Sequence, residues 1–228
     1  MKLSQWIVAG LMAGLSNSYA ALAEDEGSFT FHLPLVNYSS ASAQAKSNAV
    51  TSTVKTTQSK TSDLSGSYVE ASWGKANLYV YPFFDSKMLS ASYYVIDALE
   101  VGLDLGVNSS TVDKPKSNAN STLVGVFGLY TVHLTKAIAL ENSLNIDMTT
   151  SSSKVTETGA GVATETKTKN SDVAVKLIVN AVVPLAKNIQ YLGGLSYTSD
   201  SNNNKQDNIK TTTGNFGVNI ATVRLILK

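Results

Sequence analysis

Apolar and polar residues alternate along much of this chain, most clearly between residues 89 and 107. In that stretch every second position on either side of residues 96–98 is apolar or aromatic: Leu89, Ala91, Tyr93 and Val95, then Leu99, Val101, Leu103, Leu105 and Val107. A period of two predicts β-strands whose two faces meet different surroundings. The three residues between the runs leave room only for a tight reversal, so the pattern predicts an antiparallel hairpin.

The same alternation recurs along the chain and predicts ten strands. They cover residues 27–38, 67–73, 78–84, 89–95, 99–107, 122–134, 138–148, 173–183, 189–197 and 214–228. The alternative is a barrel of eight strands in which residues 77–95 are continuous. Pro34 removes a backbone donor, so we expect a bulge or a locally unpaired position there. The apolar phase of the last strand slips by one residue near Ile220, which a β-bulge would absorb.

The predicted connections are of two lengths. Short turns fall near residues 75–76, 97–98, 136–137 and 187–188. The long connections are polar, and we expect exposed loops at residues 39–63, 108–120, 149–171 and 199–213, the first with frayed strand extensions as an alternative. Short connections at one end and long ones at the other are typical of bacterial outer-membrane barrels. The predicted fold class is all-β, an antiparallel up-and-down transmembrane β-barrel.

The first 23 residues have the three parts of a secretory signal peptide. Lys2 supplies the basic start, residues 6–15 are apolar, and small residues lead to cleavage after Ala23, or alternatively after Ala20. The apolar run is shorter than the ~20 residues that a spanning helix needs. We therefore expect a signal peptide at residues 1–23 and one barrel domain at residues 24–228.

Composition narrows the classes of function. Removal of Lys2 from the 18 basic residues leaves 17 against 17 acidic ones, so the mature chain is neutral and nucleic-acid binding is not expected. Cysteine is absent, so an exported chain must take its stability from a large core or a closed barrel. Charged residues make up only 15% of the chain, which suits a barrel whose outer band carries no charge.

If the apolar face meets lipid, the opposite face of each strand points into the barrel. Its charged residues are then Glu70, Glu100, Asp104, Glu141, Asp147, Lys176 and Arg224. Enclosed charges must pair or be hydrated, because an isolated buried ion is costly. Two arrangements satisfy this requirement. One is a salt-bridged plug that nearly fills a small barrel, and the other is a narrow hydrated path in which the acidic excess favours cations.

Aromatic residues near the strand ends are candidates for the interfacial girdles that anchor membrane barrels. They are Tyr38, Trp73, Tyr93, Tyr130 and Tyr197. The alternative is ordinary strand packing, because aromatic side chains favour strands in any case.

The sequence offers little for catalysis. His32 and His133 are its only histidines, and neither a nucleophile elbow, an HExxH motif nor a phosphate-binding loop is present. Glu100 and Asp104 are four residues apart on one strand face, which is too common a spacing in a polar lumen to indicate an acid/base pair. We therefore predict a protein that is not an enzyme, with no cofactor and no metal site.

The hairpin at residues 93–103 resembles a periplasmic hairpin of small Gram-negative outer-membrane β-barrels, the porin-like group that includes the OmpA transmembrane domain, OmpX and OmpW. It combines an aromatic-ended strand, a turn containing Asp97 and a Leu-x-x-Gly continuation at residues 99–102. The resemblance implies a place in the cell outer membrane, contact with outer-membrane lipid and lipopolysaccharide, and assembly by the barrel assembly machinery. It also implies that the loops could contact extracellular surfaces.

The C-terminus departs from this group, whose members usually finish on an aromatic residue that the assembly machinery reads. This chain ends on Lys228, which leaves the alternating Val223, Leu225 and Leu227 for that recognition. The predicted function is an outer-membrane barrel that acts as a structural or surface-contact protein, or as a weak pore for small solutes and cations. The alternative is a soluble exported β-sandwich or barrel that binds a ligand or partner, because half-buried antiparallel sheets also alternate.

Overall fold

The computed structural model describes residues 28–46, 51–61, 67–81, 88–113, 116–159, 162–204 and 209–227. The predicted signal peptide and residues 82–84 of the strand predicted at residues 78–84 lie outside these ranges. Within them, no helix is long and apolar enough to cross a membrane.

The described residues form one antiparallel sheet that closes on itself through the pairing of the first and last strands. Its strands are β1 (Ser28–Lys46), β2 (Thr51–Thr61), β3 (Tyr68–Trp73), β4 (Ala76–Val80), β5 (Leu89–Ile96), β6 (Leu99–Asp113), β7 (Lys116–His133), β8 (Ala139–Gly159), β9 (Val162–Ala186), β10 (Ile189–Asn204) and β11 (Ile209–Leu227).

These eleven strands occupy ten positions around the barrel. β2 and β3 pair with successive parts of β1, since Thr61 lies opposite Val36 and Tyr68 lies opposite His32. They are therefore two segments of one strand position. β4 and β5 are separate and pair with each other. The ten-strand antiparallel barrel predicted from the sequence is confirmed, and the eight-strand alternative is wrong.

Short turns close one end of the barrel, which we call the turn end. Two-residue turns join β3 to β4, β5 to β6 and β9 to β10, and residues 134–138 join β7 to β8. Gly74 begins the first of these turns with a φ of 57°. Glycine adopts this left-handed conformation without steric cost, as tight hairpin turns require.

The prediction that the long polar stretches are loops is wrong for most of their length. β1 and β2, β6 and β7, β8 and β9, and β10 and β11 continue as paired strands through these stretches. A ladder that starts in the apolar part can continue outward, because each further residue pair satisfies its backbone groups. Water on both faces removes the apolar alternation, so periodicity gives no signal for these strands. We call this side of the barrel the hairpin end.

The two faces of the sheet are reversed relative to a soluble protein. Large apolar side chains point outward, and Leu103, Leu105 and Val107 on β6 are 58%, 51% and 58% exposed. On the alternate positions of the same strand, Glu100 and Asp104 point inward and are 1% and 0% exposed. An apolar outer band around a polar interior is the distribution of a transmembrane β-barrel.

Two β-bulges adjust the seam where β1 meets β11. Pro34 lies opposite Thr222 and Val36 opposite Ala221, so Leu35 is the extra residue on β1. Asn37 then lies opposite Asn219, so Ile220 is the extra residue on β11. Both predicted irregularities are confirmed. Because one bulge lies on each strand, they cancel, and the register beyond them continues without a net shift.

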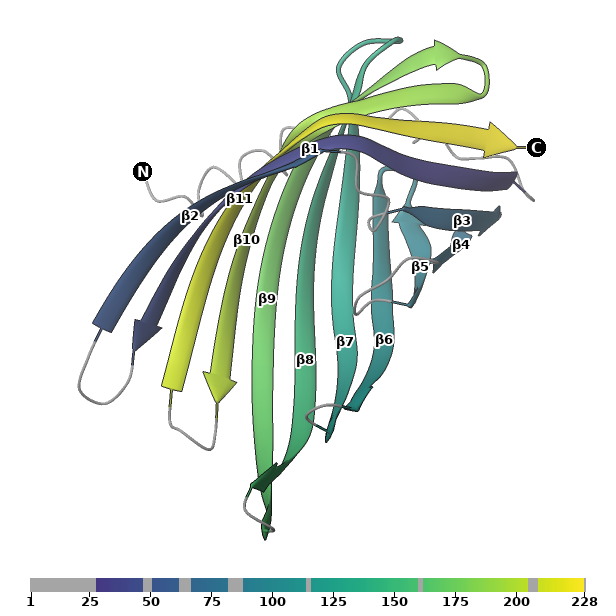
Figure 1. Cartoon of the computed structure of the whole chain (residues 1–228). Coiled ribbons are helices and arrows are strands. Elements are labelled where there is room, and N and C mark those ends of the chain that lie inside the picture. Colours follow the sequence, from purple (N-terminus) through teal and green to yellow (C-terminus); the bar gives the residue numbers. More distant parts are fainter. Residues whose placement is uncertain are drawn as a thin grey trace.

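The barrel wall has two heights (Figure 1). β3, β4 and β5 contain 6, 5 and 8 residues, and we call them the short wall. β6 to β11, together with β1 and β2, form the tall wall, in which β8 and β9 reach 21 and 25 residues. A transmembrane strand needs about 9–11 residues. The tall wall therefore extends well beyond the apolar band.

Candidate functional site

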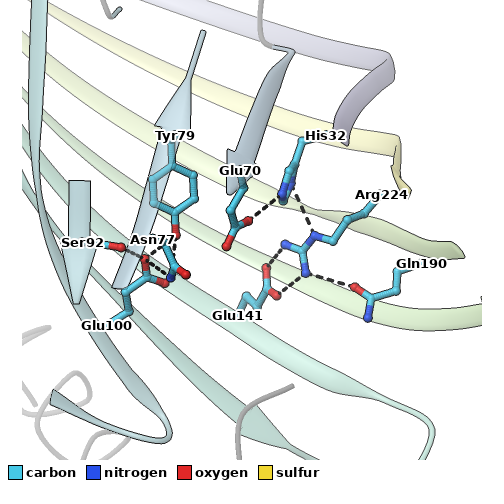
Figure 2. A network of polar contacts seen from close by, with 9 residues as sticks. All are labelled: His32, Glu70, Asn77, Tyr79, Ser92, Glu100, Glu141, Gln190 and Arg224. Atoms are coloured by element: carbon cyan, nitrogen blue, oxygen red, sulfur yellow. Dashed lines mark hydrogen bonds and ion pairs between the residues drawn. The ribbon is translucent and has the colours of Figure 1, made fainter. Parts of the chain in front are cut away.

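Polar side chains meet inside the barrel near the turn end (Figure 2). We call the following nine residues the lumen network: His32, Glu70, Asn77, Tyr79, Ser92, Glu100, Glu141, Gln190 and Arg224. Strand register brings several of them to one level. Arg224 on β11 lies opposite His32 on β1 and Gln190 on β10, and His32 lies opposite Tyr68 on β3.

Arg224 bridges strands that are not neighbours. Its two terminal nitrogens donate to the two carboxylate oxygens of Glu141 at 2.8 and 3.0 Å, and one of them also donates to Gln190 Oε1 at 3.1 Å. Glu141 lies on β8, so the ion pair spans the inner face of β9 and β10. Such a two-pronged pairing fixes both orientation and distance.

Apolar side chains lie beside this ion pair on the inner face. Ala139, Val182 and Leu192 form a buried cluster, and their strand positions are directly opposite one another on β8, β9 and β10. Ala139 is two residues from Glu141 on the same face of β8, so the cluster adjoins the ion pair by strand position. Apolar surroundings strengthen an electrostatic attraction.

His32 links Arg224 to Glu70. Arg224 Nε donates to His32 Nδ1 at 3.4 Å, and His32 Nε2 lies 2.9 Å from Glu70 Oε2. An Nδ1 that accepts a hydrogen bond places the ring proton on Nε2, which can then donate to the carboxylate. The Tyr68 ring stacks on His32 with centroids 3.9 Å apart and holds the imidazole in this orientation.

Glu100 forms the second part of the network with donors from the short wall. Its Oε1 accepts hydrogen bonds from Tyr79 Oη, from Ser92 Oγ and from Asn77 Nδ2, the last at 3.2 Å. These three donors are neutral. Four residues further along β6, towards the hairpin end, Asp104 accepts a hydrogen bond from Ser90 Oγ. Glu100 and Asp104 thus accept hydrogen bonds from side chains of β4 and β5.

Aromatic rings fill the space beside these carboxylates. Tyr68 contacts Tyr79 and Tyr81 with centroid separations of 5.8 and 5.2 Å, and Tyr79 meets the edge of Phe127 at 6.0 Å. Phe127 lies against Gly102, where a Cβ atom would come within 2.4 Å of its ring. The glycine on β6 thus makes room for a ring that supports Tyr79.

The structure places all seven predicted lumen residues on the inner face, at two levels. Glu70, Glu100, Asp104, Glu141 and Arg224 lie together near the turn end, and the four acids are buried. Asp147 and Lys176 are half-buried and lie nearer the hairpin end. Asp147 lies over Gly125, where a Cβ would come within 2.0 Å of its Oδ1 atom.

The candidate girdle residues lie at two levels. Trp73, Tyr93 and Tyr130 are near the turn end, and Tyr130 is half-buried there. Tyr38 and Tyr197 lie nearer the hairpin end and are 39% and 49% exposed. Their role as membrane anchors stays a prediction.

Sequence reasoning missed the neutral members of the network. The sequence prediction named only charged residues on the inward face. It therefore omitted five members of the network: His32, Asn77, Tyr79, Ser92 and Gln190. Strand parity could have found His32 and Tyr79, because each occupies the same face of its strand as a buried polar neighbour, Thr30 or Asn77.

Among the described residues, no group of three or more His, Cys, Asp or Glu side chains is placed to hold a metal ion. The network's chemistry is that of a fixed ion pair and a hydrogen-bonded carboxylate. Together, the closed barrel, the apolar outer band and the polar interior define an outer-membrane type of β-barrel.

Comparison with known proteins finds a likeness only among solved structures. No protein-family model and no curated protein sequence matches this chain. Among solved structures, Neisserial surface protein A is 12% identical, with 88% of this chain and 99% of that chain covered and a TM-score of 0.31. Ail, the attachment invasion locus protein of Yersinia pestis, is also 12% identical over the same shares, with a TM-score of 0.27. The N-terminal β-barrel domain of Pseudomonas aeruginosa OprF is 10% identical over 85% and 97%, with a TM-score of 0.24.

Proposed function

We propose that this protein is an outer-membrane β-barrel whose lumen is closed near the turn end by the lumen network. Its function is then structural or surface contact through the hairpin end, with the signal peptide directing export. The apolar outer band supports the membrane location, and the height of the tall wall supports a role outside the membrane.

One observation carries the proposal. The Arg224–Glu141 ion pair reaches from β11 to β8 across two intervening strands, and His32 continues the network to Glu70 on β3. A narrow lumen crossed at one level by buried, mutually paired side chains offers no continuous column of water for ions. The arrangement supports the salt-bridged plug, one of the two arrangements that the sequence allowed, over the hydrated path.

The test is single-channel conductance of the refolded protein in a planar bilayer. A gel comparison of unboiled and boiled samples first establishes a folded barrel, which migrates differently before boiling. We expect folded wild-type protein to be silent and an Arg224→Ala/Glu141→Ala variant to give discrete steps. Discrete steps from the wild-type protein would overturn the closed lumen. Identical migration in both samples and recovery in the soluble fraction would support the soluble β-sandwich or barrel instead.

A second candidate function, a weak cation pore, is favoured by the charge of the interior. Glu70, Glu100, Asp104 and Glu141 outnumber Arg224 near the turn end. Four carboxylates around one guanidinium would attract cations to any hydrated path. A Glu100→Gln/Asp104→Asn variant separates the two functions, because its loss of cation preference would show that these carboxylates line a pore.

A further inference from the structure

His32 joins two halves of the lumen network. In one half, Arg224 is held by Glu141 of β8 and Gln190 of β10. In the other half, the carboxylate of Glu70 on β3 lies 2.9 Å from His32 Nε2. The hydrogen bond from Arg224 Nε to His32 Nδ1, at 3.4 Å, connects the halves. Figure 2 shows these contacts in a row across the lumen.

The connecting hydrogen bond requires a neutral imidazole. Arginine carries only donors and stays protonated, so its contact with His32 needs an acceptor at Nδ1. A histidine with a second proton on Nδ1 would present a donor to a donor and a positive charge to a positive charge. The contact that joins the two halves therefore belongs to one protonation state of His32.

The charged and titratable groups around His32 come from several strands. They are Glu70 and Tyr68 on β3, Arg224 on β11, Glu141 on β8 and, further away, Tyr79 on β4, Tyr81 and Glu100 on β6. Tyrosine and arginine have ordinary pKa values of about 10 and above 12, so they keep one charge state in neutral and mildly acidic solution. Histidine has an ordinary pKa of about 6.5 and changes its charge within this range. The carboxyl groups are the remaining groups that acid can change.

Proton uptake by His32 gives each of two carboxylates its own cation. The imidazolium pairs with Glu70, and the guanidinium of Arg224 keeps its two hydrogen bonds to Glu141. Each ion pair is then complete in itself, whereas the contact between the pairs changes from a hydrogen bond to a repulsion of like charges. The network thus has two arrangements, one joined across the lumen and one divided.

We propose that protonation of His32 divides the lumen network and opens the lumen, so that the barrel is closed at neutral pH and conducts in mild acid. The inference rests on the proposed function, because only a lumen that the network closes can be opened by dividing the network. His32 and Arg224 are directly opposed in the ladder of β1 and β11, where like charges destabilise one another. The stacked ring of Tyr68 holds the imidazole in place, so the arginine side chain moves towards Glu141 and water enters between the halves.

The experiment compares the pH dependence of the current through wild-type protein and two histidine variants. His32→Gln replaces the imidazole by an amide that offers an acceptor and a donor and stays uncharged. The matched control is His133→Gln, which removes the chain's other histidine, a half-buried residue of β7 outside the lumen network. Each protein is refolded and its barrel is checked by gel migration. The mean current in a planar bilayer is then measured at about pH 7.5 and about pH 5, on either side of the ordinary histidine range.

We expect wild-type protein and His133→Gln to be silent at the higher pH and to open in discrete steps at the lower one. Because a single proton controls the contact, the open probability should fall about tenfold per pH unit above the midpoint. His32→Gln should give the same current at both pH values, since position 32 can no longer change its charge. The NMR signal of the His32 Cε1 proton, assigned by its absence from His32→Gln, should titrate with the same midpoint as the current.

A pH response that persists in His32→Gln overturns the switch, because carboxyl groups would then control the lumen. Loss of the response in His133→Gln, or midpoints of the current and the His32 signal that differ by more than about one pH unit, overturns it too. Silence of folded wild-type protein at both pH values removes the switch and leaves the closed lumen of the proposed function intact. Discrete steps from wild-type protein at the higher pH would instead sink the proposed function itself.

Discussion

The short wall and the tall wall differ in what their inward faces carry. On the short wall nearly every inward position is polar and buried, including Glu70, Ser72, Asn77, Ser90 and Ser92. Its strands, of 6, 5 and 8 residues, fall below the ~9–11 that a transmembrane strand needs. On the tall wall, inward residues such as Asp172 and Asp200 are half-buried, while the ladder continues far beyond the band.

Backbone hydrogen bonds and side-chain contacts therefore contribute in different proportions to the stability of the two walls. A long strand pair adds backbone hydrogen bonds with each residue, so the hairpins of the tall wall beyond the apolar band depend little on particular inward side chains. The short wall has few such bonds, and side chains tie it to the rest of the barrel. Glu70 reaches β1 through His32, and Glu100 of β6 binds Asn77 and Tyr79 of β4 and Ser92 of β5.

The largest effect should come from removing Arg224. In Arg224→Ala, the buried Glu141 loses its ion-pair partner and His32 loses a donor, so we expect the free energy of unfolding to fall by about 3–5 kcal/mol. Urea unfolding of the refolded protein in lipid vesicles measures this loss. The double variant Arg224→Ala/Glu141→Ala should recover part of it, because no charge is left uncompensated. A loss below about 1 kcal/mol in the single variant would mean that the network does not hold the barrel together.

A smaller loss of stability is expected where Gly102 packs against Phe127, whose ring contacts Tyr79 of the lumen network. In Gly102→Ala, the new Cβ would lie 2.4 Å from the Phe127 ring and 2.7 Å from the backbone oxygen of Ala91. The ring or the β5 backbone must move, at a cost of about 1–3 kcal/mol. Gly128→Ala is the matched control, because the nearest atom to its Cβ would be 3.9 Å away. Equal unfolding curves for the two variants would show that Phe127 is not packed against the wall of β6.

The strands within the apolar band were largely predictable, because lipid outside and polar groups inside impose an alternation of apolar and polar residues that is visible in the sequence. The hairpin of β5 and β6 and the bulges at Pro34 and Ile220 are confirmed for this reason. The extended hairpins were not predictable, since a strand with water on both faces has no period to read. Residues 149–159 and 162–171 have the composition of a loop and the pairing of a sheet.

The network was predictable only in part. The alternation along each strand places Glu100 and Arg224 on the inward face. Which side chains they contact depends on which strands face each other across the lumen and on the register of those strands. Arg224 and Glu141 are 83 residues apart and three positions apart in the sheet, so no local pattern joins them. Neutral donors such as Ser92 and Tyr79 resemble ordinary strand residues until the carboxylate beside them is known.

The smallest effect should be found on the inward face of the tall wall, where Asp172 and Asp200 lie beyond the apolar band. Burial raises the pKa of both carboxyl groups, and the proximity of Asp200 further raises that of Asp172. An acid whose pKa is raised in the folded state binds its proton more tightly there, so it contributes stability below its unfolded pKa that is lost as the pH rises through the folded pKa.

Asp200→Asn should therefore stabilise the protein slightly at pH 7, by less than about 0.5 kcal/mol because these groups are partly exposed and screened. The difference from wild type should narrow as the pH falls towards the ordinary range of aspartate. Urea unfolding at both pH values measures it, with Asp97→Asn as the control for an exposed aspartate at the turn end. If Asp200→Asn instead destabilises the protein at pH 7, the carboxylate is held by favourable partners. The hairpins of the tall wall beyond the apolar band would then also rely on specific inward contacts, as the short wall does.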